Sequence, residues 1–375
     1  MSEVSLVQPK KVRKVSPGQV ISQVLSYTIF ILWAAITILP LFWMGYSSFK
    51  SNEELTRDTF AFPSTLFNAG DHKFRVIPLS LNVRVPAEFK DTIDDRVILE
   101  STSISPGRRL FVFYPLRSEL PQEIANIQPG DIITGDQLHG SMERKIGWEL
   151  FLYNYSNAFE RGGLGFKFMN SLLYAGLSTF LIILFALMIG FAVSKLGMPK
   201  LSNAVTALVG VGYLISINSV IIPLYLMLSS IGLTDTRVGI ILVYTAFGLP
   251  LATMLTSQFI KGLPDSLIES AYIDGASVWK MFTSIIVPMT TPVIVTAGII
   301  SALGIWNEFL LVLVLASSET TKSLPVGVYS FSSLTGTELG WQLAALVIAA
   351  APAMIVYFAF NKRITQGVVG GAIKG

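Results

Sequence analysis

The chain has 375 residues, of which 52% are hydrophobic and only 14% are charged, and its mean hydropathy is +0.61. This composition excludes an ordinary soluble protein and predicts a membrane protein. The net charge of +3 is too small to indicate nucleic-acid binding. With no cysteine and only two histidines, the chain offers little for disulfides, metal sites or catalytic triads. It also contains no G-x-x-x-x-G-K sequence, so it has no P-loop for ATP hydrolysis.

Six apolar stretches have the length that a membrane-spanning helix needs, about 20 residues. The first could instead be a signal peptide, because basic residues precede it. Its apolar run exceeds the usual signal length and no small-residue cleavage site follows, which favours a span. The sequence therefore predicts an all-α polytopic membrane protein with six transmembrane helices. These cover residues 21–44, 171–194, 201–229, 238–259, 292–316 and 343–360.

The basic residues of the tails and short loops predict how the six helices are oriented. Short cytoplasmic loops are rich in lysine and arginine. With a cytoplasmic N-terminal tail (1–20), the C-terminal tail (363–375) is cytoplasmic as well, and the short outside loops hold only Arg237 and Lys322. The inside then holds Lys10, Lys11, Arg13, Lys14, Lys195, Lys200, Lys261, Lys280, Lys362, Arg363 and Lys374.

A polar segment at residues 45–168 separates the first span from a five-helix core at 169–362. Sixteen of the 24 acidic residues lie between Glu53 and Glu160. Within it, residues 79–85 alternate strictly between apolar and polar, and turn-forming residues flank Ile132 and Ile133. We therefore expect an extracytoplasmic β-rich insert at about 66–150. A solvated disordered loop is the alternative.

The loop at residues 260–288, between the fourth and fifth spans, lies on the predicted cytoplasmic side. Pro264 suits the first turn of a helix, and Asp265 and Glu269 suit its positive N-terminal end. Gly275 can end that helix in a left-handed turn, and a second short helix from Ser277 leads into the fifth span. Such a finger, with an apolar side that includes Ile268 and Ala271, should pack against a partner. An ordinary pair of interfacial helices is the alternative.

The finger contains Glu269-Ser270-Ala271, then Gly275, and then Ile286-Val287-Pro288. This pattern resembles the signature of inner-membrane permease subunits of binding-protein-dependent ABC importers, which is E-A-A, three residues, G, and about nine residues later I-x-L-P. The chain departs from the signature at Ser270 and Val287. Other segments resemble the smaller, maltose-type permease of the sugar-importing branch. These are Asn154-Tyr155-Ser156-Asn157-Ala158-Phe159, Asn170-Ser171-Leu172, Ile222-Pro223-Leu224-Tyr225, Asp274-Gly275-Ala276, Trp306-Asn307-Glu308-Phe309, Leu324-Pro325-Val326-Gly327 and residues 367–375.

The resemblance implies an assembly in which this chain is a non-catalytic subunit of the bacterial or archaeal cytoplasmic membrane. Its partners would be a second permease, two ATPase subunits that bind ATP and Mg, an extracytoplasmic substrate-binding protein, a sugar and membrane lipid, with no cofactor in this chain. The finger would dock in a groove of the ATPase. Glu269 would be the charged contact, Ala271 the small residue that permits close approach, and Pro288 the fixed exit. Ser270, Asp274, Gly275 and Ala276 would complete the docking segment and its turn. The insert is the main departure from the family pattern.

Polar residues within the third and fifth spans are candidates for the substrate path. Asn218 and Tyr225 are seven residues apart and so share a helical face, and Asn307 and Glu308 lie in the fifth span. A buried asparagine more often joins helices than binds ligand, and a structural hydrogen bond is the alternative for Glu308. An ion-coupled secondary transporter and a membrane-anchored sensor that uses the insert are the rival functions.

Overall fold

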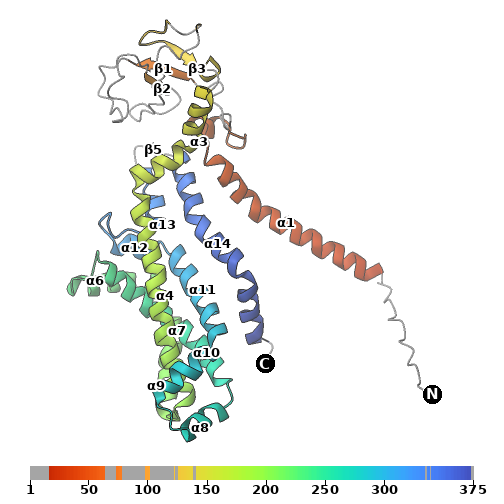
Figure 1. The fold of residues 1–375 in the computed structure, drawn as a ribbon, viewed down its shortest axis with the longest axis vertical. Helices are drawn as coiled ribbons and strands as arrows, with labels where there is room; N and C mark the ends of the chain where they lie inside the picture. Colours follow the sequence, from red (N-terminus) through yellow and green to blue (C-terminus); the bar gives the residue numbers. More distant parts are fainter. Residues whose placement is uncertain are drawn as a thin grey trace.

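The protein is an elongated bundle of long helices with a small β-sheet at one end (Figure 1). The computed structural model describes residues 17–63, 73–77, 98–101, 122, 126–137, 141–333, 336–337 and 339–372. Helices α4, α7, α11 and α14 run along the bundle, α8 and α9 lie at the end opposite the sheet, and α1 leans away from the others (Figure 1). The end of the bundle that carries the sheet is named the sheet end, and the opposite end is named the α8 end.

Four helices in the described residues are long and apolar enough to cross a membrane by themselves. They are α1 (Pro17–Ser47), α4 (Leu164–Lys195), α7 (Arg237–Lys261) and α14 (Leu339–Ala372). A fifth crossing exists if the segments Val278–Met289 and Thr291–Asn307, which meet at a bend of 75°, form one span. The helices expected at 21–44, 171–194, 238–259 and 343–360 are therefore present.

The stretches expected as the third and fifth spans are interrupted. Residues 201–229 form α5 (Pro199–Leu214), the 3-10 turn η5 (Ile217–Ser219) and α6 (Ile221–Ser230). Pro223 would clash with the carbonyl of residue 219 in one continuous helix, so the break before it has a steric cause. Residues 292–316 form α11 (Thr291–Asn307) and α12 (Leu310–Leu315), with extended backbone at Glu308. Six uninterrupted spans are thus not observed in the described part of the chain.

Helices α4 and α7 pack closely along their length because small residues lie between them. A Cβ atom added at Gly190 would lie 3.0 Å from Thr256 Oγ1 and 3.1 Å from the backbone nitrogen of Ser257. Two hydrogen bonds also cross the contact, from Thr256 Oγ1 to the Ala186 carbonyl (3.0 Å) and from Ser194 Oγ to the Ser257 carbonyl (3.1 Å). Small residues and side-chain hydrogen bonds of this kind hold helices together in membranes, where the hydrophobic effect between helices is absent.

The described part of the insert contains an antiparallel sheet in the order β2-β1-β3. Strand β1 (Lys73–Ile77) pairs with β2 (Ile98–Ser101) and with β3 (Ile132–Thr134). Phe74, Leu99 and Ile133 are buried on it. The strand expected at 79–85 lies outside the described residues, so a β-rich character of the whole insert stays a prediction.

The two ends of the insert meet beside the bundle. Asn154 of α3 (Ser141–Gly162) donates from its side-chain amide to the carbonyls of Ser48 and Lys50, each at 2.8 Å. The rings of Phe49 and Phe151 stack at 4.1 Å between centroids. The insert therefore leaves and rejoins the bundle at one junction. The remaining short elements are α2 (Asn52–Arg57), η4 (Gly135–Gln137), α13 (Leu324–Tyr329), and β4 (Ser332–Ser333) paired with β5 (Gly336–Thr337).

The close contact of α4 with α7 can be tested with the variant Gly190→Val. The added side chain must displace Thr256 and the backbone at Ser257, and overpacking of this kind costs about 1 to 3 kcal/mol. Gly176→Val is the matched control on the same helix, since a Cβ there meets no described atom within 4 Å. Thermal denaturation of the purified proteins in detergent should show a lower midpoint for Gly190→Val alone. Equal midpoints for the two variants would contradict the close packing.

Candidate functional site

The finger between α7 and α11 is closed by a left-handed turn at Gly275. Helix α8 (Ser266–Ile273) ends in two backbone hydrogen bonds, from Gly275 N–H to the Tyr272 carbonyl (3.0 Å) and from Ala276 N–H to the Ala271 carbonyl (2.9 Å). This pair of bonds is the Schellman motif, which requires a residue with positive φ. Gly275 has φ of 71°, and a Cβ there would meet no described atom within 4 Å. The turn predicted from the sequence is present, and its requirement for glycine comes from the backbone.

The second arm of the finger is short and leads into a sharp bend. Ser277 caps α9 (Val278–Met281) by accepting a hydrogen bond from the Lys280 amide at 3.3 Å. The π-helix η6 (Phe282–Ile286) and α10 (Val287–Met289) follow, and then the bend of 75° into α11. Pro288 lies exposed in α10, at the start of a helix, where its missing N–H is tolerated.

Helix α8 has an inward and an outward face. Ile268 and Ala271 are buried with Phe191 of α4 and with Met281 and Phe282 of the second arm. The small side chain of Ala271 lets α8 approach its own bundle, and the close approach of a partner expected at this residue stays a prediction. The exposed residues lie on the other face and at the tip. They are Glu269, Ser270, Asp274, Gly275 and four large apolar residues, Tyr272 (53% exposed), Ile273 (86%), Val278 (46%) and Trp279 (62%).

A buried lysine attaches the finger to the bundle. Lys195, the last residue of α4, is only 4% exposed in its side chain. Its Nζ donates to the Leu263 carbonyl at 2.6 Å and to Asp265 Oδ1 at 2.5 Å. Asp265 is the N-cap residue immediately before α8. Sequence reasoning placed Asp265 only near the positive end of the helix and did not find Lys195 as its partner.

The expected substrate-path residues lie at the two breaks. Asn218 is exposed in η5, and Tyr225 is 38% exposed on α6. Asn307 is exposed at the end of α11, where its amide donates to the Leu303 carbonyl of its own helix at 2.9 Å. In the described residues no hydrogen bond joins these side chains to one another. The breaks themselves are neighbours, since α12 contacts both η5 and α6.

Glu308 holds the break between α11 and α12 in place. Its Oε2 accepts a hydrogen bond from the Tyr244 hydroxyl of α7, and its Oε1 accepts one from the Leu311 amide, both at 2.9 Å. The structural hydrogen bond weighed for this residue is therefore present. The Leu311 amide lies in the first turn of α12, where amides have no partner within the helix, so the carboxylate also caps this helix.

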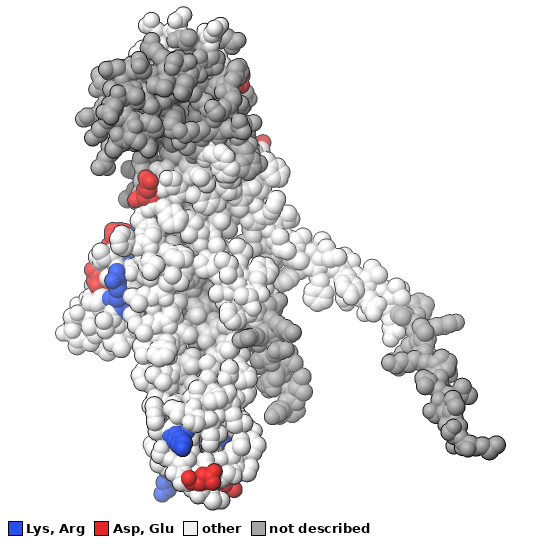
Figure 2. All heavy atoms as spheres, viewed as in Figure 1, with Lys and Arg blue, Asp and Glu red and all other residues white. Residues whose placement is uncertain are grey.

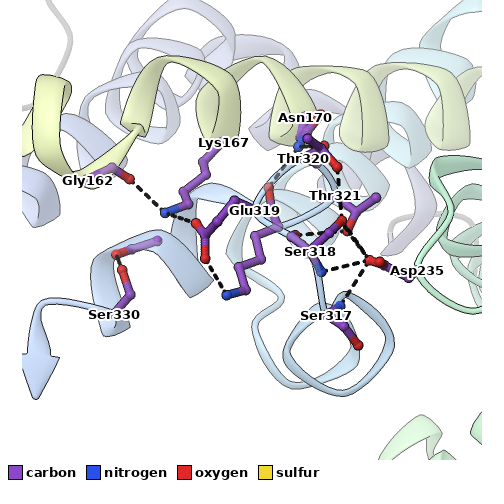
Figure 3. A network of polar contacts seen from close by, with 12 residues as sticks. Gly162, Lys167, Asn170, Asp235, Ser317, Ser318, Glu319, Thr320, Thr321 and Ser330 are labelled. Atoms are coloured by element: carbon purple, nitrogen blue, oxygen red, sulfur yellow. Dashed lines mark hydrogen bonds and ion pairs between the residues drawn. The ribbon is translucent and has the colours of Figure 1, made fainter.

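A polar network at the sheet end of the bundle was not found from the sequence (Figure 3). Asp235 has φ of 54°, and its Oδ1 accepts hydrogen bonds at 3.0 Å from the backbone amides of Ser317 and Ser318. The hydroxyls of Ser318 and Thr321 donate to the same oxygen. These hydrogen bonds, chiefly that from Thr321, hold the pKa of Asp235 below its ordinary value of 3.8. The carboxylate thereby fixes the loop at 317–322 against the start of α7.

The start of α4 contributes to the same network (Figure 3). Asn170 donates to the carbonyls of Thr320 and Lys322, both at 2.9 Å. Lys167 is 4% exposed in its side chain, and its Nζ contacts the Gly162 carbonyl at 2.7 Å and Glu319 at 2.8 Å. This lysine and Lys322 keep the pKa of Glu319 below its usual value. The scarcity of acidic residues in this half of the chain was the one sequence signal that could have pointed to Asp235 and Glu319.

The charged side chains on the face shown in Figure 2 gather at the two ends of the bundle, with an uncoloured surface between them.

Residues 158–370 match the family described as the binding-protein-dependent transport system inner membrane component. This match covers more than half of the chain. The chain belongs to that family. Together with its long apolar helices, membership makes it a multi-pass membrane protein.

Several relatives are similar to this chain over most of their own length. A putative ABC transporter permease, ORF2 of a Caldicellulosiruptor species, is 32% identical over 59% of this chain and 80% of the relative. The melibiose/raffinose/stachyose import permease MelC of Bacillus subtilis is 31% identical over 60% of this chain and 82% of its own length. The diacetylchitobiose uptake permease NgcG of Streptomyces coelicolor is 30% identical, with 64% and 80% covered. A crystal structure of a bacterial alginate ABC transporter has a chain 24% identical to this one, with a TM-score of 0.46, covering 58% of this chain and 85% of that chain.

The variant Asp235→Asn tests whether the carboxylate fixes the loop at 317–322. Hydrogen bonds to a charged group are worth about 1.5 to 3 kcal/mol, so the thermal midpoint at pH 7 should fall. Because the folded-state pKa is depressed, this contribution is full above the ordinary pKa and is lost as the pH falls through the folded pKa. The difference from wild type should therefore shrink in acid. The exposed carboxylate variant Asp274→Asn is the control, and an Asp235→Asn midpoint equal to it at pH 7 would contradict the assignment.

Proposed function

We propose that this chain is a permease subunit of an ATP-driven importer and forms half of the translocation path for a sugar or oligosaccharide. The observation that carries the proposal is the finger, a rigid turn that leaves an apolar tip exposed within the segment matched by the family. The names of MelC and NgcG, which refer to the import of melibiose, raffinose and stachyose and to the uptake of diacetylchitobiose, support the substrate class. ATP and Mg would bind to a separate ATPase subunit, so this chain would be non-catalytic.

The proposed topology places both termini and the finger in the cytoplasm. The distribution of lysine and arginine over the tails and short loops supports this orientation. The four long helices would each cross once, and the interrupted segments 199–230 and 278–315 would each cross once more, making six crossings. The insert and the network around Asp235 would then lie outside, where a substrate-binding protein has to dock.

The tip of the finger supplies the contact with the ATPase in this proposal. Ile273 and Trp279 are the most exposed large apolar side chains of the tip, and a groove that covers them would remove this area from water. Glu269 and Asp274 would add charged contacts at the rim, and the Gly275 turn would set the width of the tip. Ala271 and Ile268 would transmit the contact to the bundle, because they pack on its core.

The substrate path in this proposal follows the two breaks. A continuous helix uses all of its backbone polar groups internally, whereas an interrupted one leaves some of them free to line a polar pathway. Asn218 and Asn307 are exposed at these breaks, and Tyr225 is exposed on α6 beside one of them. Because these side chains are exposed in this chain, they would be able to line a path that is completed on its other side by the second permease.

Purification without crosslinker tests the function and the chemistry of the contact. Wild-type protein should retain an ATPase subunit and a second permease, whereas a homo-oligomer alone would contradict an importer. Ile273→Ser should reduce the retained ATPase by about tenfold or more, since burying a large aliphatic side chain is worth about 1.5 to 3 kcal/mol. Glu269→Ala should be milder, because an exposed ion pair contributes about 0 to 1 kcal/mol. A larger loss of bound ATPase for Glu269→Ala than for Ile273→Ser would show that the contact depends on charge and not on apolar burial.

The variant Gly275→Val tests whether the left-handed turn is required for coupling. A β-branched residue at positive φ costs about 1 to 2 kcal/mol of backbone strain, and its side chain would widen the tip. Gly275→Asn is the matched control, because asparagine tolerates this conformation. In reconstituted complexes, substrate-stimulated ATP hydrolysis should fall strongly for valine and only partly for asparagine. Normal stimulation of the valine variant would argue against the finger as the transmitting element.

A further inference from the structure

The cytoplasmic end of α4 holds a cation that is hidden from water. The side chain of Lys195 is 4% exposed, whereas its ion-pair partner Asp265 is 78% exposed. A buried ammonium group is unfavourable unless it is paired and hydrogen-bonded, so its bonds to Asp265 and to the Leu263 carbonyl fix its position. Leu263 lies two residues after the end of α7, and Asp265 is the N-cap residue of α8. One side chain thus joins the ends of α4 and α7 to the start of the finger.

The opposite end of α4 has a lysine in the same situation. Lys167 is equally buried and holds the Gly162 carbonyl and Glu319. Between Lys167 and Lys195 the helix is continuous, and its 32 residues span about 48 Å. Helix α4 therefore connects the finger directly to the loop at 317–322, which Asp235 and Asn170 also hold.

Two other routes lead from the finger into the bundle, through α7 and through α11. Helix α7 ends at Lys261, shortly before α8 begins, and it packs along α4. The route through α11 is bent, because the π-helix η6, the short α10 and the bend of 75° lie between α9 and α11. Insertions and sharp kinks of this kind change the helical path and can absorb a displacement. Helix α4 is continuous and is held at both ends by a buried lysine, so it has no such joint. Displacement of the finger should therefore pass into α4, and into the α7 packed against it, rather than into α11.

We infer that Lys195 is the positioning residue that attaches the finger to α4, and that α4 carries the displacement of the finger to the external loop at 317–322. The inference rests on the proposed function, because it assumes that an ATPase acts on the finger. The inference adds to the proposed function the helix that transmits the movement, α4, and the contact that makes this helix respond, the one made by Lys195.

The test uses the whole reconstituted complex and the variant Lys195→Met, which keeps the aliphatic stem and removes the charge and its hydrogen bonds. Lys261→Met, an exposed lysine at the end of α7, is the matched control. The expected result for Lys195→Met is an unchanged yield of bound ATPase and unchanged basal hydrolysis, with stimulation by the loaded binding protein reduced about tenfold. Lys195→Arg keeps the charge and should restore part of the stimulation.

A second readout follows the external loop itself. The chain has no cysteine, so Ser317→Cys introduces a single exposed thiol at that loop. Its rate of modification by a maleimide should change when ATP is added to the complex, and the Lys195→Met background should abolish that change. If Lys195 only stabilised the fold, Lys195→Met would not abolish the ATP-dependent change in labelling while leaving the yield of bound ATPase unchanged.

The outcomes separate the inference from the proposed function. Normal stimulation and normal ATP-dependent labelling in Lys195→Met would overturn the inference while leaving the importer intact. Loss of the bound ATPase from Lys195→Met would show that the lysine only folds the finger, which also overturns it. A wild-type protein that binds no ATPase would overturn the proposed function and the inference together.

Discussion

The contact between α4 and α7 is the constraint on which the other functional elements depend. Gly190 allows the two helices to approach until Thr256 can donate to the backbone of α4. At the sheet end, the start of α7 supplies Asp235, which holds the loop at 317–322. At the α8 end, α7 leads into the finger and Lys195 of α4 closes the junction. A separation of this pair would therefore disturb both ends of the molecule at once.

Each charged group that the described structure buries is matched by a polar partner, because the apolar bundle offers no water to replace it. Lys167 and Lys195 each use one backbone carbonyl and one carboxylate. Glu308 uses a tyrosine hydroxyl and a helix-terminal amide. In each case the partner belongs to another element, so the pairing that satisfies the charge also fixes the distance between the elements.

Hydropathy predicted the four long helices, because their length and apolar character are local properties. The Gly275 turn was also predictable, since few residues other than glycine adopt its conformation. Apolar content does not report where a helix is interrupted, so it missed the breaks at 215–220 and 308–309, although Pro223 is a local signal for the first of them. The inward position of Ala271 and the partners of Asp235 and Lys195 depend on segments distant in sequence. A single sequence gives no measure of such contacts.

The division between continuous and interrupted helices also assigns different roles to polar residues in the proposed transporter. Glu308 cannot easily serve a substrate, because its two oxygens already hold Tyr244 and the first turn of α12. Removing it to bind a sugar would leave a buried hydroxyl and a helix-terminal amide without their acceptor. Within the described part of the chain, the side chains of Asn218 and Tyr225 make no hydrogen bond of this kind, and both lie exposed beside the break. In the proposed transporter the carboxylate would thus shape the pathway, and the neutral polar side chains would be the groups free to face the substrate.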